Sequence, residues 1–203
     1  MTIFKNLFSS QTIDFYGDFV DPFGYIGFHN LRLAADECGI TIRWKGFELD
    51  PETPEGGYDL QTADNSYLRA GMAASLQNFA LKAGILLQDP TFAPKTRFAH
   101  ALVLFWKGPS TVKNPLIERI YQAYLSERKN IGEASILVDI ARSFGPSEKE
   151  CKAMLNRDPS RVIQKHRKEA TDQRFAGMPA YRFRNQTYFG ARNSDQWRQV
   201  FKP

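Results

Sequence analysis

The first fifty residues constrain the fold most strongly, because they predict a strand, a helix and a second strand joined by short links. Residues Thr12–Tyr16 and Thr41–Phe47 are rich in β-branched and aromatic residues that alternate with polar ones, as in half-buried strands. Between them, Asp21-Pro22 is typical of a helix start, and Gly39 ends a run of apolar residues at helical spacing. Such a unit normally places its two strands side by side and parallel.

A helical region follows the second strand. Glu48–Leu60 contains several proline breaks and a Gly-Gly pair, so we expect a loop without regular structure there. Beyond it, apolar residues recur three and four positions apart, and Ser147 followed by Glu150 predicts a capping box at the start of a short helix. The expected helices cover Leu68–Ala83, Phe98–Phe105, Leu116–Leu125, Leu137–Phe144 and the segment after Ser147.

The C-terminal part returns to a mixed pattern. A helix should run from Asp158-Pro159 to about Phe175, followed by strands at Ala180–Phe183 and Thr187–Phe189 and by a last helix capped by Asn193 or Ser194. This order predicts an α/β chain with a thioredoxin fold and an all-helical insertion. We expect residues 11–60 and 157–203 to form the thioredoxin-fold domain and residues 61–156 to form the insertion.

Composition excludes several classes of protein. Hydrophobic residues make up 42% and charged residues 24% of the 203 positions, which is ordinary for a globular chain. The net charge of +5 is spread along the sequence, no stretch is apolar enough to span a membrane, and Met1–Ser10 does not resemble a secretory signal. We therefore expect a cytoplasmic protein that binds neither nucleic acid nor membrane.

The two cysteines argue against a metal site and a disulfide framework. Cys38 and Cys151 stand 113 positions apart, and there is no Cys-x-x-Cys or Cys/His cluster. Both fall in helix-like patterns, where a free cysteine usually acts as a small apolar side chain. We expect no bound metal.

Four groups of residues resemble the DsbA-like branch of the thioredoxin superfamily, and most closely its FrnE-like members. Asp18–Gly27 resembles the active-site loop, and Trp44–Pro51 resembles the end of the second strand. The other two groups match signatures of the helical insertion, of the cis-proline loop and of the end of the last strand. They comprise Thr96–His100 with Asn130–Gly132, and Gly177-Met178-Pro179 with Gly190-Ala191.

The departure from the family pattern concerns the two catalytic cysteines. Members of this branch usually carry Cys-Pro-Trp-Cys-Tyr, whereas Asp21 and Gly24 occupy the cysteine positions here. Dithiol exchange needs a low-pKa thiolate and a resolving partner. Cys38 lies about 25 Å along the helix from Asp21, because each helical residue adds about 1.5 Å. We therefore expect no disulfide oxidoreductase activity.

Two related groups without the dithiol suggest another chemistry. Kappa-class glutathione transferases and 2-hydroxychromene-2-carboxylate isomerases resemble this loop, and their serine supports a glutathione thiolate at the helix N-terminus, where anions are favoured. Phe23, Gly24 and Tyr25 fit the shape of that loop. An ionised Asp21 would instead occupy the anion position and repel a thiolate. Glutathione is thus the cofactor that the resemblance implies, with its sulfur displaced from the loop.

Asp21 and His100 are the candidate catalytic residues, and each also has a structural interpretation. Asp21 can be only a helix cap, or it can act as a base or as an anchor for a cation; the helix N-terminus should lower its pKa, which disfavours the base. His100 lies on an apolar helix, where a hydrogen-bonded interior histidine is the commoner case. Pro179 is expected to be cis, and its loop can serve the fold alone or pair with a ligand.

The expected ligand site lies between the Asp21–Tyr25 loop, the Met178-Pro179 loop and the insertion. Arg192 follows the last strand where the glutathione-binding relatives hold the glutamyl end of glutathione with an Asp-Arg pair, but the matching Asp is missing. A basic run from Arg161 to Arg174 is best explained as a solvated helix face. The candidate binding residues are Pro22, Phe23, Gly24, Tyr25, Phe47, Met178, Pro179 and Arg192.

Three functions remain open at this stage. The first, which we favour, is a glutathione- or thiol-dependent isomerase or transferase acting on a small organic substrate. The second is a thiol-independent enzyme whose cleft has been rebuilt around Asp21, and the third is a non-catalytic protein that binds a peptide or another ligand. The expected partner is a small molecule, with a homodimer as a further possibility.

Overall fold

The computed structural model describes residues 11–60 and 66–202, and the side chains of residues 66–73 lie outside that description. The segment Met1–Ser10 and the expected helix positions Leu68 and Met72 therefore fall beyond the described residues or side chains. A four-stranded sheet has the order β2-β1-β5-β6. Its strands are β1 (Thr12–Gly17), β2 (Thr41–Gly46), β5 (Ala180–Phe183) and β6 (Gln186–Phe189).

The N-terminal unit forms as its sequence predicts. Strands β1 and β2 pair in parallel, with Phe15 opposite Trp44, and α1 (Pro22–Cys38) connects them. Asp21 accepts a hydrogen bond from the Phe23 N–H at the start of α1. Gly39 ends the helix with φ 65°, in the left-handed region that glycine adopts without steric cost.

The C-terminal strands complete the sheet in the opposite direction. β5 pairs antiparallel with β1, and β6 pairs antiparallel with β5. Arg184 and Asn185 form the turn between β5 and β6, both with positive φ. The last helix, α8 (Ser194–Phe201), is capped by Asn193, whose side chain accepts from the Gln196 N–H. This arrangement, with the parallel β1–β2 pair, is a thioredoxin fold.

The region between β2 and α7 is mainly helical. The capping box at Ser147 and Glu150 forms as expected. The described residues of this region form, before α7, β3 (Tyr58–Asp59), α2 (Ser66–Lys82), β4 (Phe92–Ala93), α3 (Arg97–Leu104), α4 (Lys113–Leu125), α5 (Ala134–Arg142) and α6 (Glu148–Leu155), with a 3-10 turn at Ser110–Val112.

Three expectations about the segments between β2 and β5 are wrong in detail. The insertion is not all-helical, because β4 pairs antiparallel with β3, which itself lies in the segment expected to be an irregular loop. Each of these strands has two residues, too few for a periodic pattern, and the paired residues, such as Tyr58 and Ala93, are far apart in the sequence. α7 (Ser160–Asp172) ends before Phe175, where the chain turns with Arg174 at φ 54°.

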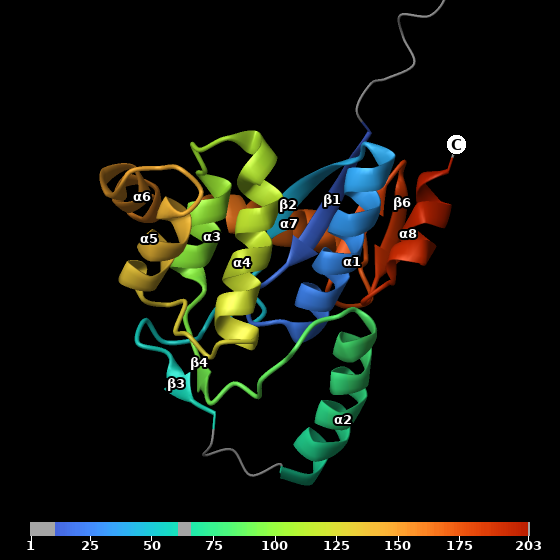
Figure 1. Cartoon of the computed structure of the whole chain (residues 1–203), viewed down its shortest axis with the longest axis horizontal. Helices are drawn as coiled ribbons and strands as arrows, with labels where there is room; N and C mark the ends of the chain where they lie inside the picture. Colours follow the sequence, from blue (N-terminus) through green and yellow to red (C-terminus); the bar gives the residue numbers. More distant parts are fainter. Residues whose placement is uncertain (1–10, 61–65, 203) are drawn as a thin grey trace, which may run out of the picture.

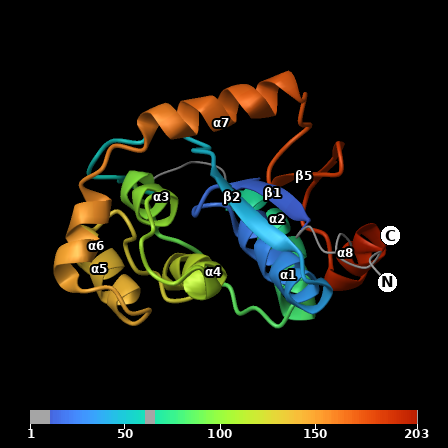
Figure 2. The same cartoon turned by 90° about the horizontal axis from the view of Figure 1, so that it is seen from above.

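Helices cover both faces of the sheet. Figure 2 shows α7 crossing one face, while α1 and α8 lie on the other. Helices α3 to α6 gather beyond β2, and α2 stands apart at the lower edge in Figure 1. Most buried apolar side chains join one core between the sheet, α1, α4 and α8, and Phe15, Phe28 and Trp44 make ring contacts at its centre. The core thus extends without a break from the sheet into the insertion.

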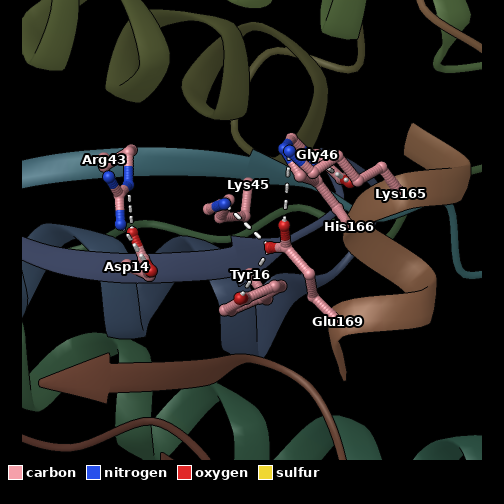
Figure 3. Close-up of polar contacts among 8 residues, drawn as sticks. All are labelled: Asp14, Tyr16, Arg43, Lys45, Gly46, Lys165, His166 and Glu169. Atoms are coloured by element: carbon pink, nitrogen blue, oxygen red, sulfur yellow. Dashed lines mark hydrogen bonds and ion pairs between the residues drawn. The ribbon is translucent and has the colours of Figure 1, made fainter. Parts of the chain in front are cut away.

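Polar contacts fasten α7 to the sheet (Figure 3). Lys45 Nζ donates to Glu169 Oε2 at 2.8 Å, and the Tyr16 hydroxyl donates to the same oxygen at 3.2 Å. His166 Nδ1 donates to the Gly46 carbonyl at 3.2 Å. These bonds join residues more than 100 positions apart, and they hold β1 and β2 to α7 across the length of the insertion.

None of the helices in the described part of the chain is both long enough and apolar enough to cross a bilayer.

Candidate functional site

The α1 N-terminus carries the site that the sequence points to. Asp21 is almost completely buried, at 6% exposure. Its Oδ1 accepts from the Phe23 N–H at 3.0 Å, and its backbone carbonyl accepts from the Tyr25 N–H at 3.0 Å. The capping role of Asp21 is therefore observed, and one of the N–H groups that a helix leaves free at its start is already satisfied.

The second carboxylate oxygen of Asp21 differs from the first in its hydrogen bonding. Asp21 Oδ2 is buried and has no hydrogen-bond partner among the described residues, and the same holds for the hydroxyl of Tyr121 on α4. Both atoms lie over Gly24: a Cβ atom at that position would be 3.0 Å from Asp21 Oδ2 and 2.9 Å from the Tyr121 oxygen. Glycine at position 24 thus makes room for two polar groups that approach the first turn of α1.

Burial changes the acidity expected for Asp21. The sequence predicted a lowered pKa at the helix N-terminus. Instead, removal from water raises the pKa of Asp21 to about 6, because this effect exceeds the opposing influence of the nearby Gly24 and Phe23 backbone N–H groups. The charge of nearby Asp18 raises it further. Asp21 therefore exchanges its proton close to neutral pH, as an efficient general base does.

The cis-proline loop lies beside the second turn of α1. The Met178–Pro179 peptide bond is cis. A Cβ atom at Gly27 would be 3.2 Å from Pro179 Cγ, 3.5 Å from Ala191 Cα and 2.3 Å from the Tyr181 hydroxyl. The Tyr181 oxygen is also buried without a partner among the described residues. The structure therefore brings the first two turns of α1, the Pro179 loop and two buried tyrosine hydroxyls close to one another.

His100 is paired with Asp18, whose charge also acts on Asp21. It is fully buried on α3, its Nε2 is 3.1 Å from Asp18 Oδ1, and its ring contacts those of Phe19 and Trp44. Asp18 also accepts from the backbone N–H groups of Phe19 and Leu49, both at 2.8 Å. The Asp18–His100 pair therefore links the β1–α1 loop and the β2–β3 loop to α3. This corresponds to the hydrogen-bonded interior histidine that was considered for His100 from the sequence.

The candidate binding residues lie in different parts of the fold. Phe47 and Met178 pack with Tyr16 on the sheet face covered by α7. Arg192 stacks over the rings of Tyr188 and Trp197, at 4.9 and 5.8 Å from their centroids. Its cation–π contacts place it on the β6–α8 side.

The remaining candidates begin α1. Pro22 and Phe23 are half-buried, whereas Gly24 and Tyr25 are buried. The Tyr25 ring stacks on that of Tyr121 with centroids 5.4 Å apart and planes at 10°. These residues and Asp21 thus form one compact group at the helix start.

Sequence reasoning missed Tyr121 and Tyr181 as polar members of this group. Tyr121 belongs to the apolar stripe of α4, and Tyr181 occupies an inward position of β5, and both positions are typical of core residues. Only the positions of their hydroxyls relative to Gly24 and Gly27 distinguish them from ordinary core tyrosines. The two glycines one turn apart on α1 were the available signal.

Neither cysteine is placed for chemistry at this site. Cys38 is exposed at the last position of α1, and Cys151 is buried on α6. Burial raises the pKa of the Cys151 thiol, which makes it less reactive. Among the described residues, no group of three or more His, Cys, Asp or Glu side chains is arranged to hold a metal ion.

The profile of the DsbA-like thioredoxin domain matches residues 12–202, nearly the whole chain. The chain belongs to this family. A protein of Bacillus subtilis (strain 168), the uncharacterized protein YwbO, is 26% identical over 165 residues, which cover 79% of this chain and 81% of YwbO. The family therefore accounts for both the thioredoxin-fold part and the helical insertion.

Solved structures with the same fold include proteins of different chemistry. A probable DsbA oxidoreductase of Streptomyces coelicolor has a TM-score of 0.79 at 19% identity, covering 94% of this chain and 88% of its own. A 2-hydroxychromene-2-carboxylate isomerase has 0.69 at 18%, covering 93% and 92%. The cytosolic disulfide reductase DsbM from Pseudomonas aeruginosa, solved with GSH, has 0.68 at 17%, covering 93% and 96%. These likenesses concern the fold, and the chemistry must be argued from the site itself.

Proposed function

We propose that this protein is an enzyme that binds glutathione or another small thiol between the α1 N-terminus and the Pro179 loop. It would use the thiol either to isomerise a small organic substrate or to transfer the thiol group to that substrate. One observation carries the proposal. Asp21, which replaces the first cysteine of the family motif, is a buried carboxyl with a pKa of about 6 at the start of a helix. It is therefore suited to exchange a proton with a thiol near neutral pH.

The proton balance removes the repulsion expected between Asp21 and a thiolate. When the thiol ionises, its proton passes to the Asp21 carboxylate, so the helix end becomes neutral as the sulfur becomes negative. The remaining N–H groups of the first turn then favour the thiolate. Thiolate formation and Asp21 protonation thus support each other, whereas an ordinary ionised aspartate would oppose the thiolate.

The reaction steps follow from this exchange. The thiolate adds to an electron-poor carbon of a substrate double bond, which forms a C–S bond and leaves the electron pair on the substrate. In a transfer, protonated Asp21 returns its proton to that carbanion. In an isomerisation, the former double bond rotates, the C–S bond breaks, and the thiolate takes back the proton from Asp21. Neither route needs an oxidant or a second thiol.

Support also comes from the neighbours in fold. A 2-hydroxychromene-2-carboxylate isomerase and a disulfide reductase solved with GSH share the architecture. The reductase is described as cytosolic, and two free cysteines without a disulfide suit a reducing compartment, so a cytoplasmic location is part of the proposal.

Calorimetric titration with glutathione tests the proposal, together with ultraviolet absorbance of the bound thiolate. We expect saturable binding and a thiolate signal with little net proton release to the buffer. Asp21→Asn keeps the shape and the cap but cannot take the proton, so its thiolate signal should be lost at neutral pH. Asp36→Asn, an exposed change on the same helix, is the matched control. Absence of glutathione binding, or a thiolate signal unchanged by Asp21→Asn, would refute the proposal.

A thiol-independent enzyme is the second candidate. It is favoured by the Asp21 Oδ1–Phe23 N–H bond, which already fills part of the anion position at the helix end. Such an enzyme would use Asp21 directly on its substrate. Failure of glutathione to bind, combined with loss of a metabolite-dependent turnover in Asp21→Asn, would select this candidate over the first.

A further inference from the structure

A groove of about 670 Å³ lies between α1 and α4, and it adjoins the site described above through Tyr25, which lines it. The segment after α2 and the end of α5 close its sides. The Tyr25 ring stacks on that of Tyr121, whose hydroxyl lies near Gly24, whereas Asp21 does not line the groove. Its volume is within the usual range for small-molecule sites, about 300–1,000 Å³. The residues that matter most for its chemistry are His29, Ile85, Leu86, Glu118, Arg119 and Phe144.

The acidic residues of the groove are already neutralised. Glu118 accepts hydrogen bonds from both His29 and Arg32 of α1. Burial acts to raise the pKa of Glu118, but these two partners outweigh it and lower the pKa, so Glu118 stays ionised and compensated. Glu127 is likewise paired, with Arg119 at 3.0 Å and Lys129 at 2.8 Å. An incoming anion therefore meets no uncompensated carboxylate.

Arg119 supplies the unused donor. Its Nη2 donates to Glu127, whereas its Nη1 is buried and has no acceptor among the described residues. A buried guanidinium N–H without an acceptor is costly, and a charged acceptor forms the strongest bond to it. Because Nη1 is covered, a small turn of the guanidinium is needed to bring it to the groove that Arg119 lines, where a ligand anion would complete its hydrogen bonding.

The other wall of the groove is apolar and partly open. Ile85 is buried, Phe144 is half-buried, and Leu86 is 65% exposed. A leucine so exposed beside a groove loses contact with water when an apolar ligand covers it, which favours binding. The donor and the apolar wall together define one class of ligand.

We infer that this groove binds an organic anion with an apolar chain, its charged group held by Arg119 and its chain lying over Ile85, Leu86 and Phe144. The site differs from the proposed thiol site in both place and chemistry. It needs no proton exchange, and glutathione, which has no apolar chain, should not compete for it.

Sodium octanoate is the probe for a direct test, with 1-octanol as its neutral match. The chain has three histidines, of which His100 and His166 are buried, so the half-buried ring of His29 gives a distinct proton NMR signal in the groove. His29→Gln assigns that signal. We expect octanoate to shift it saturably, and 1-octanol to bind at least about tenfold more weakly, because it cannot form the charge-assisted bond.

Two variants locate the anion and the chain. Arg119→Gln should weaken octanoate binding at least about tenfold, whereas Arg97→Gln, a change at another half-exposed arginine with ion-pair partners, should not. Leu86→Glu changes an exposed side chain, so folding should be preserved, and its charge should repel octanoate.

Several results would overturn the inference. They are the absence of a saturable His29 shift, equal binding of octanoate and 1-octanol, or unchanged affinity in both Arg119→Gln and Leu86→Glu. Asp21→Asn should leave octanoate binding intact whether or not it abolishes thiolate formation. The two proposals therefore fail or succeed separately.

Discussion

Replacing Asp21 by asparagine isolates the effect of a buried charge at the start of α1. Asparagine has nearly the same shape, and its side-chain oxygen can still accept from the Phe23 N–H, which is 3.0 Å from Asp21 Oδ1. Asn and Asp are comparable N-caps, so the cap itself should survive. The difference between the two proteins is then the ionisable proton on an oxygen that has no partner among the described residues.

The size of the effect follows from the pKa of Asp21, which burial raises from an ordinary 3.8 to about 6. Between these values the folded protein binds a proton more readily than the unfolded chain, so stability falls as pH rises through this window. A separation of about two pKa units corresponds to about 3 kcal/mol. Below the window both states are protonated and the contribution disappears; above it the full destabilisation is present.

Urea unfolding of the wild type and Asp21→Asn from about pH 4 to about pH 8 measures this contribution. The free energy of unfolding of Asp21→Asn relative to wild type should rise by about 2.5 kcal/mol across that range, because only the wild type acquires the buried charge and part of the effect is already present at about pH 4. Asp36→Asn, on the exposed side of the same helix, should show no comparable trend.

A difference that does not change with pH would show that Asp21 titrates at an ordinary value and that the buried-carboxyl reasoning is wrong. An asparagine variant that becomes less stable with rising pH would contradict even the sign. The expected result, greater stability with lost thiolate formation, would mean that the protein tolerates a destabilising charge where it needs a base.

Three further outcomes follow from the structure. Gly24→Ala places a Cβ 2.9 Å from the Tyr121 hydroxyl, so thermal unfolding should show a loss of about 1–2 kcal/mol, since overpacking costs more than the helix preference of alanine returns. Glu169→Gln removes the charge that accepts a hydrogen bond from Lys45, so the free energy of unfolding measured in urea should fall by about 1–2 kcal/mol. An unchanged urea midpoint would show that this contact does not stabilise the packing of α7 on the sheet. We propose that residues 61–156 interrupt one folding unit, so that limited proteolysis within them should leave no separately stable half, and recovery of a folded N-terminal fragment would contradict this.

Much of the fold could be predicted because the relevant interactions are local. Asp21 and Gly39 mark the ends of α1 through cap and left-handed conformations that involve neighbouring residues only. The Ser147–Glu150 capping box and the alternating strands are likewise properties of short segments. From these the strand–helix–strand unit, the helical insertion and the closing hairpin followed in order. The loss of both motif cysteines was also evident from the sequence.

The β3–β4 pair and the end of α7 were predicted incorrectly for a different reason. Two-residue strands carry no periodicity, and their pairing depends on where the chain returns after α2. The helical pattern of α7 continues past Asp172, but the turn at Arg174 redirects the chain toward β5. Tertiary structure decided both the β3–β4 pairing and the end of α7, because the local sequence preferences were compatible with the predicted and the observed structure alike.

The chemistry of the candidate site was decided by tertiary structure alone. From sequence, Asp21 was a helix cap with a lowered pKa; in the fold, burial beside Tyr121, one hundred positions away, reverses the direction of that shift. His100 and Arg192 were candidates by residue type, and the fold pairs one with Asp18 and stacks the other on aromatic rings. Patterns along a chain report which backbone conformations its segments prefer. The acidity of a carboxyl depends instead on how much water and which polar atoms remain around it, and those are set by distant segments that meet only when the chain has folded.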